Sequence, residues 1–165
     1  MNNILFDKFL KLVQGLNERE IKYCIVDGLA LNLLGISRYT EDIDIFISSD
    51  RENIYKLINF LREFFKDEVL EELTVSSFER YPVIRYGTQD GFYIDLITAL
   101  GEEINWKTIE RNLQEVMLEN ITIPIPTLEY MIKLKEGASL FREKDKVDLI
   151  YLKKLRQKSR EQRIS

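Results

Sequence analysis

Two aspartates separated by a single residue are the part of this sequence best suited to chemistry. Asp42 and Asp44 lead into an apolar run that continues to Ile47. In a β-strand, residues two apart lie on the same face, with their Cα atoms about 6.5 Å from one another. Because neighbouring carboxylates repel each other, and because hard divalent cations prefer carboxylate oxygens, this spacing predicts a metal site.

A third aspartate could complete this site. Asp95 is the single acidic residue in the otherwise apolar segment 92–97, and aspartate is depleted in strands. If that segment lies beside the strand of Asp42 and Asp44, its carboxylate comes within about 5 Å of theirs as a cross-strand neighbour. Three clustered carboxylates predict magnesium. Alternatively, Asp42 caps its strand, Asp44 faces solvent on an edge strand, and Asp95 pairs with a nearby Arg or Lys.

The turn before these aspartates could hold phosphate. Asp27-Gly28 leads an apolar strand directly into a helix, and the first amides of a helix can bind an anion. A triphosphate and a metal would then lie together. Taken in isolation, Gly28 has another explanation, because a strand-to-helix turn can require the unusual φ that glycine adopts.

Hydrophobic periodicity predicts the elements that must position these residues. We expect helices at about 4–19, 29–34, 51–65 and 106–113, and two more that begin at Thr127 and Arg142. We expect strands at about 21–26, 43–47, 73–76, 83–86, 92–97, 116–118 and 121–125, with a hairpin turn at 89–91. Helices and strands alternate first and helices end the chain, which indicates an α+β fold in which helices cover a sheet. The length predicts one domain, residues 1–165, with its core at about 21–125 and C-terminal helices at about 127–160.

The composition excludes several classes of protein. The sequence has no histidine, which excludes the usual hydrolase triads and zinc sites built on imidazole. Its single cysteine, Cys24, cannot form a disulfide within the chain and is predicted to be a buried strand residue. Charged residues interrupt the apolar N-terminal stretch, unlike a signal peptide. No apolar run reaches the roughly 20 residues of a membrane span, so we expect a cytoplasmic protein that does not bind membranes.

The C-terminal segment is basic although the whole chain has a net charge of −4. Residues 153–165 contain six Lys and Arg residues and one acidic residue, Glu161. Such a segment could contact the phosphates of RNA or DNA. The interpretation that we favour is a solvated helix end, where cations interact favourably with the helix dipole.

The motifs together resemble the DNA polymerase β-like nucleotidyltransferase superfamily, whose members combine a glycine turn, Asp-x-Asp and a third acidic residue on a later strand. The small members related to abortive-infection and toxin–antitoxin nucleotidyltransferases are the most similar, through the pattern formed by Gly28, Leu29, Ala30, Gly35, Arg38, Thr40, Asp42 and Asp44. The similarity continues in Lys135, Lys144-Asp145 and Asp148. In one departure, Asp27 stands where this family has its first glycine.

The resemblance implies a mixed β-sheet flanked by helices and a metal-dependent enzyme that transfers a nucleoside monophosphate from a nucleoside triphosphate to a hydroxyl acceptor. Asp42, Asp44 and Asp95 would be the catalytic and metal-binding residues, with Mg²⁺ or Mn²⁺ as the ion. The nucleotide would contact Gly28, Leu29, Arg38, Thr40 and Lys135. A tRNA, another RNA, a protein or a small molecule would be the acceptor, and a co-encoded toxin or antitoxin would be a partner.

Two other functions remain open at this point. Asp27 would repel a triphosphate unless it points away or binds metal, which favours a module that binds nucleotide or a partner without chemistry. Alternatively, the protein serves interaction alone, with the acidic cluster recruiting partners, because 32% of its residues are charged.

Overall fold

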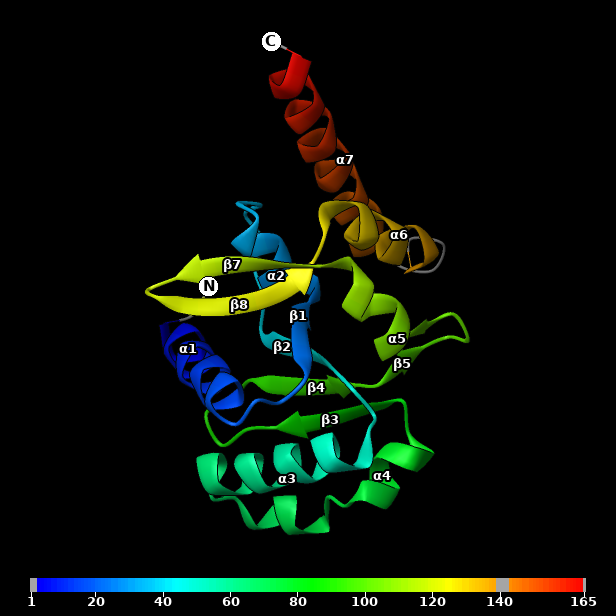
Figure 1. The fold of residues 1–165 in the computed structure, drawn as a ribbon. Coiled ribbons are helices and arrows are strands. Elements are labelled where there is room, and N and C mark those ends of the chain that lie inside the picture. Colours follow the sequence, from blue (N-terminus) through cyan, green and yellow to red (C-terminus); the bar gives the residue numbers. More distant parts are fainter. Residues whose placement is uncertain (1–2, 139–142, 165) are drawn as a thin grey trace. The chain divides into compact units, whose positions relative to one another are not determined.

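The structure, a computed structural model, describes residues 3–138 and 143–164, which form two compact units, Met1–Ile125 and Pro126–Ser165 (Figure 1). The helices are α1 (Asn3–Glu18), α2 (Asp27–Leu33), α3 (Arg51–Phe65), α4 (Val75–Arg80), α5 (Trp106–Ile109), α6 (Leu128–Ala138) and α7 (Glu143–Ile164), and the 3₁₀ turns are η1 (Glu68–Glu72) and η2 (Glu110–Asn112). The strands are β1 (Tyr23–Val26), β2 (Asp42–Ile47), β3 (Val83–Gly87), β4 (Tyr93–Ile97), β5 (Ala99–Leu100), β6 (Ile104–Asn105), β7 (Leu113–Leu118) and β8 (Ile121–Pro126).

A four-stranded mixed sheet organises the first unit. Its strand order is β1-β2-β4-β3, in which β2 and β4 run parallel and the two outer pairs are antiparallel. The two inner strands are buried on both faces after their first residues, as expected for a covered parallel pair. The predicted α+β fold, with a mixed sheet and flanking helices, is confirmed.

One face of the sheet packs on helices. Figure 1 shows α3 running along the sheet beside β3 and β4. Tyr86 of β3 belongs to this face: its ring packs edge-on against Phe65, and its hydroxyl donates a hydrogen bond of 2.7 Å to Asp67. Residues alternate across a strand, so Arg85 and, through the register, Asp95 lie on the opposite face. The sheet thereby separates an apolar core from the polar face.

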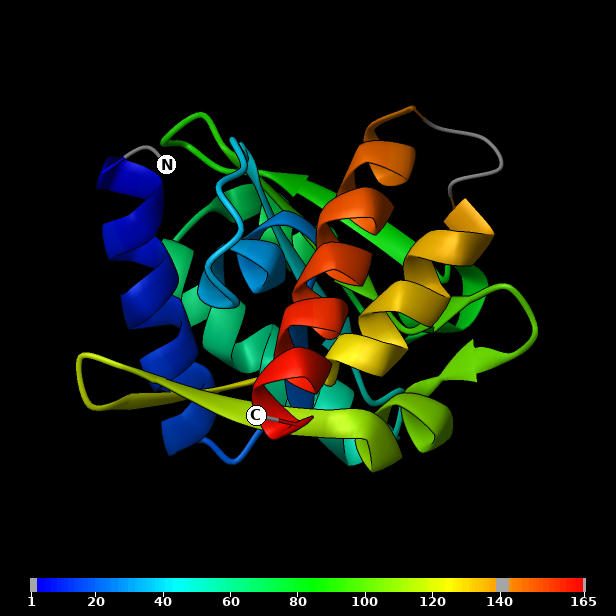
Figure 2. The ribbon, with the colours of Figure 1, turned by 90° about the horizontal axis from the view of Figure 1, so that it is seen from above.

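The second unit is a pair of helices. Figures 1 and 2 show α6 and α7 side by side. Helix α6 begins at Leu128, one residue after the predicted Thr127, while Arg142, the predicted beginning of α7, lies outside the described residues. Among the described residues, no helix combines the length and the apolar character that a bilayer crossing requires.

One predicted strand is wrong. Residues 73–76 alternate apolar and polar side chains, but the structure has helix α4 beginning at Val75. The backbone amide of Thr74 donates a hydrogen bond of 3.1 Å to Ser77 Oγ, which caps the beginning of the helix. Val75 and Phe78, three residues apart, are buried on one side of α4. The capping hydrogen bond therefore favours a helix here, although the alternation of apolar and polar residues predicted a strand.

Candidate active site

Three aspartates lie on the polar face of the sheet. The parallel pairing of β2 and β4 places Asp44 directly opposite Asp95, and Asp42 opposite Tyr93. Asp42 and Asp44 lie two residues apart on one strand, so their side chains share this face. Asp44 and Asp95 are each 8% exposed, which removes most of the water that would otherwise solvate their charges. The strand pairing thus joins the three aspartates selected from the sequence.

The electrostatics of this cluster reflect unbalanced negative charge. Burial, the nearby charge of Asp27, and the hydrogen bond and charge of Asp95 together raise the pKa of Asp44 to about 8. Burial also raises the pKa of Asp42, although the positive charge of Arg85 opposes this shift. Asp44 therefore requires a proton or a cation near neutral pH.

Arg85 provides a positive charge beside two of these carboxylates. Its Nε and Nη2 atoms donate hydrogen bonds of 2.9 Å each to the two oxygens of Asp95, and Nη2 donates another of 3.2 Å to Asp42 Oδ2. The sequence reading missed this residue. A signal was present, because the hairpin turn at 89–91 fixes the register that places Arg85 opposite Asp95.

The turn between β1 and α2 lies near this cluster, since Val26 pairs with Asp44 across the sheet. Asp27 adopts a φ of 61°, a left-handed conformation that favours glycine. Gly28 is tightly enclosed: a Cβ there would lie 3.0 Å from Thr40 Oγ1 and 3.3 Å from Arg38 Nη1. A larger residue at position 28 would therefore require Thr40 or Arg38 to shift.

Arg38 and Thr40 are held by local contacts. Arg38 Nη1 lies 3.5 Å from Asp27 Oδ1, and the backbone amide of Arg38 donates a hydrogen bond of 3.1 Å to Asn32 Oδ1. Thr40 Oγ1 donates a hydrogen bond of 3.0 Å to the carbonyl of Asp42. Leu29 has its side chain buried, so it could contact a ligand only through its backbone. The connection after α2 is thereby fixed against both the glycine turn and β2.

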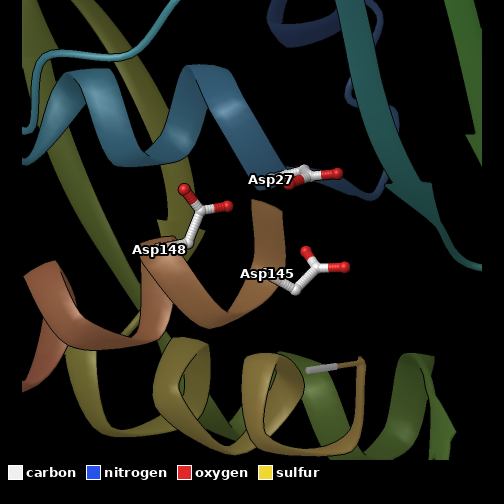
Figure 3. A group of neighbouring side chains, drawn as sticks. All are labelled: Asp27, Asp145 and Asp148. Carbon is white, nitrogen blue, oxygen red and sulfur yellow. The ribbon is translucent and has the colours of Figure 1, made fainter. Parts of the chain in front are cut away.

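Lys135 belongs to the second unit, on α6. Its Nζ lies 2.6 Å from Asp145 Oδ1 and 3.0 Å from Asp148 Oδ2, both on α7. Figure 3 shows these two carboxylates on the same side of α7, and it also labels Asp27 at the beginning of α2. Lys144 is exposed. Asp145 and Asp148 therefore join α7 to α6 through Lys135.

Comparison with known families decides the classification. The family described as "Nucleotidyl transferase AbiEii toxin, Type IV TA system" matches residues 28–159, most of the chain. The chain belongs to the AbiEii family. The resemblance to nucleotidyltransferases seen in the sequence is therefore confirmed. The general enzyme class of this AbiEii protein is that of its family, the nucleotidyltransferases. The match begins at Gly28, one residue after the departure at Asp27.

Solved structures agree with the fold of this AbiEii protein. The lincosamide antibiotic adenylyltransferase LnuA, bound to lincomycin, is 14% identical with a TM-score of 0.61, covering 90% of this chain and 96% of LnuA. The antibiotic-resistance factor ANT(2'')-Ia is 16% identical with a TM-score of 0.59, covering 96% and 85%. An antigenic nucleotidyltransferase-like protein from Paracoccidioides brasiliensis is 18% identical with a TM-score of 0.55, covering 87% and 72%. Comparison with curated protein sequences gave no significant match.

The carboxylates of this AbiEii protein form a donor set that suits a hard divalent cation. All three residues offer oxygen ligands, they lie on adjacent strands, and Asp44 faces Asp95 across the pair. The raised pKa of Asp44 shows that this arrangement gains from a positive charge. Oxygen-only ligands of this kind would suit Mg²⁺ or Mn²⁺.

Proposed function

We propose that this protein is a metal-dependent enzyme that transfers a nucleoside monophosphate from a nucleoside triphosphate to a hydroxyl acceptor. The register of β2 and β4 is the observation that carries this proposal, because it places Asp44 opposite Asp95 with Asp42 on the same face. Membership of the AbiEii family supports nucleotidyl transfer as the reaction class.

Asp42, Asp44 and Asp95 would hold Mg²⁺ or Mn²⁺. Bound there, divalent ions neutralise the charge of the triphosphate and stabilise the charge that develops on the transferred phosphoryl group. The protein's own contribution is positioning, because the parallel pairing of β2 and β4 holds the three carboxylates on one face of the sheet. The absence of histidine from the sequence is compatible with this chemistry.

Asp95 is the proposed base for the acceptor. It accepts the proton of the acceptor hydroxyl while that oxygen forms a bond to the α-phosphorus. The bond between the α-phosphorus and the bridging oxygen breaks, and pyrophosphate leaves with the electron pair. Asp95 is oriented for this role by β4, whose flanking residues Ile94 and Leu96 are buried on the other face.

The glycine turn and its neighbours would bind the nucleotide. Gly28 and Leu29 would contribute backbone amides to the triphosphate, and Arg38 and Thr40, which lie against Gly28, would border the same turn. Lys135 on α6 is the fifth proposed contact. Its two carboxylate partners on α7 hold its ammonium group in a defined position.

The acceptor and partner follow from the family and remain proposals. Two structures of similar fold belong to proteins that act on antibiotics or confer resistance to them, and LnuA is an adenylyltransferase. We infer ATP as one donor to be tested, and a tRNA, another RNA, a protein or a small molecule as acceptor. The family name refers to a toxin of a type IV toxin–antitoxin system, so we also infer a co-encoded antitoxin.

A transfer assay tests the proposed function. The protein is mixed with each α-³²P-labelled nucleoside triphosphate and MgCl₂, with tRNA or a co-encoded protein as acceptor. We expect label on the acceptor with wild type and at least about a 100-fold lower rate with Asp44→Asn, because a metal ligand is lost. Asp50→Asn is the matched control: Asp50 precedes α3, makes no capping hydrogen bond through its side chain, and its loss should not change the rate. Equal transfer by wild type and Asp44→Asn would refute the assignment.

A second function is favoured by Asp27. Its carboxylate is among the causes of the raised pKa of Asp44, and the same charge would oppose a triphosphate. The protein would then bind nucleotide or a partner without catalysing transfer. Calorimetry with ATP or GTP, with and without Mg²⁺, distinguishes the two, because metal-dependent binding without turnover on any acceptor supports this module. Measured transfer rejects it.

A further inference from the structure

Arg85 occupies the acidic cluster in a specific geometry. Through Nε and Nη2 it donates to both oxygens of Asp95, at 2.9 Å each, and through Nη2 also to Asp42 Oδ2 at 3.2 Å. Three of the six carboxylate oxygens of Asp42, Asp44 and Asp95 therefore already accept from one guanidinium. Paired donors of this kind are among the stronger hydrogen bonds in proteins.

The guanidinium is also held from a second direction. The Arg85 Cζ atom lies 4.7 Å from the centre of the Tyr93 ring. Tyr93 is on β4, opposite both Asp42 on β2 and Gly87 on β3. Because a guanidinium is attracted to an aromatic face, Tyr93 holds Arg85 over the carboxylates although half of the arginine side chain is exposed.

We propose that Arg85 is an internal counter-ion that competes with the divalent metal for Asp95 and Asp42. This inference rests on the proposed function, since it assumes that these carboxylates bind the ion. A cation that takes oxygens of Asp95 must displace at least part of the paired hydrogen bonds, so Arg85 lowers metal affinity while no nucleotide is bound. The displaced guanidinium stays attached to edge strand β3, beside the site, where it can meet the negative charge of an incoming triphosphate.

The competition predicts that removing the arginine tightens metal binding. Free Mn²⁺ is titrated against wild type and Arg85→Gln and followed by electron paramagnetic resonance, with no nucleotide present. We expect Arg85→Gln to bind Mn²⁺ about ten-fold more tightly, because one charge-assisted pair no longer opposes the ion. Arg85→Lys keeps the charge without the bidentate geometry, so its Mn²⁺ affinity should lie between those of wild type and Arg85→Gln. Tyr93→Leu keeps the arginine but removes the ring, so its Mn²⁺ affinity should rise less than that of Arg85→Gln.

Controls separate this effect from general charge. Arg80→Gln removes the same charge at the end of α4, and its Mn²⁺ affinity should equal that of wild type. Circular dichroism establishes that every variant is folded. If Mn²⁺ binding is lost in Asp44→Asn but Arg85→Gln, Arg85→Lys and wild type bind equally, or the arginine variants bind more weakly, the competition is refuted while the metal site stands. If neither wild type nor any variant binds Mn²⁺, both the competition and the proposed metal site are refuted.

Discussion

Asp27 is the residue at which this chain departs from its family resemblance, and the structure shows two physical consequences. Its φ of 61° is one that glycine adopts at less cost than aspartate does. Its charge also contributes to the raised pKa of Asp44. Arg38 Nη1, 3.5 Å away, partly balances the carboxylate. We therefore expect Asp27 to weaken nucleotide binding.

Replacing Asp27 should strengthen nucleotide binding. We expect Asp27→Gly to lower the Kd for MgATP several-fold, to about one fifth or less, and to raise stability by up to about 1 kcal/mol because the left-handed conformation is relaxed. Isothermal titration and thermal unfolding measure the two effects. Asp27→Asn is the control that removes only the charge: if it reproduces the affinity gain, electrostatics is the cause. Unchanged or weaker binding in both variants would contradict this account of Asp27.

The pKa of Asp44 predicts how stability depends on pH without metal. Its folded value of about 8 lies above the usual 3.8, so the native state retains a proton that the unfolded chain has lost. This group therefore stabilises the fold fully below pH about 4, and that stability is lost as the pH rises to about 8.

The variant Asp44→Asn should remove this dependence. In EDTA at pH 8.5, we expect the free energy of unfolding of the variant to exceed that of wild type by roughly 1 kcal/mol or more. This difference corresponds to about 2–4 °C in Tm for a chain of this size. At pH 4 the difference should shrink. Calorimetry across this range measures it, and adding Mg²⁺ should stabilise wild type alone. A wild type more stable than the variant at pH 8.5 in EDTA would disagree with the assigned burial and repulsion.

At the scale of the element, the sequence predicted the strands that carry the candidate site because the signals for these strands were local. The alternation around Asp42 and Asp44 identified β2, and the turn at 89–91 identified the β3–β4 hairpin. The order β1-β2-β4-β3 could not be derived, because the position of β4 beside β2 depends on contacts between distant segments. The strand predicted at 73–76 failed for the opposite reason, since a local hydrogen bond between Thr74 and Ser77 was not recognised.

Arg85 illustrates the limit for side chains. The hairpin fixes its partner on β4 as Asp95. Its contact with Asp42 additionally requires β2 to lie on the other side of β4. This placement depends on tertiary contacts that the local sequence does not reveal. A prediction based only on unusually placed acidic residues therefore identified the carboxylates but not the arginine that pairs with them.

The packing of α1 on α3 gives a prediction at this scale. A Cβ added to Gly15 would overlap the ring of Phe60, which is 2% exposed. Alanine gains about 1 kcal/mol of helix propensity over glycine, but overpacking typically costs about 1–3 kcal/mol. We expect Gly15→Ala to be destabilised by up to about 2 kcal/mol in urea unfolding, the difference between these two terms.

Gly137→Ala is the matched comparison. Gly137 is also a helix residue, on α6, but a Cβ there meets nothing within 4 Å. Its replacement should leave stability unchanged or raise it by up to about 1 kcal/mol. If both alanine variants gained equally, the close contact between α1 and α3 would be wrong.

At the scale of the whole molecule, the chain has two compact units, and we predicted from its length that they fold as a single domain. Circular dichroism and tryptophan fluorescence test this, because Trp106 is the single tryptophan and lies in the first unit while α6 and α7 contribute helical signal in the second. One domain predicts coincident urea transitions for the two probes. A helical transition that precedes the fluorescence change would show independent units.

The basic C-terminal segment is partly accounted for within the second unit. Lys153 lies 3.6 Å from Glu136, and Arg156 and Arg160 both lie within 3.6 Å of Glu129 on α6. These ion pairs support the interpretation of the segment as part of a solvated helix pair. Contact with a nucleic-acid acceptor stays a prediction for the remaining cations of this segment, Lys154, Lys158 and Arg163.

The central claim is that Asp42, Asp44 and Asp95 jointly hold divalent metal at a nucleoside triphosphate. Crystals grown with MnCl₂ and a non-hydrolysable ATP analogue test it directly through the anomalous scattering of manganese. We predict manganese peaks within about 2.0–2.4 Å of oxygens of all three carboxylates, next to the phosphates of the analogue. Nucleotide bound with manganese elsewhere, and with Arg85 still paired to Asp95, would contradict the claim.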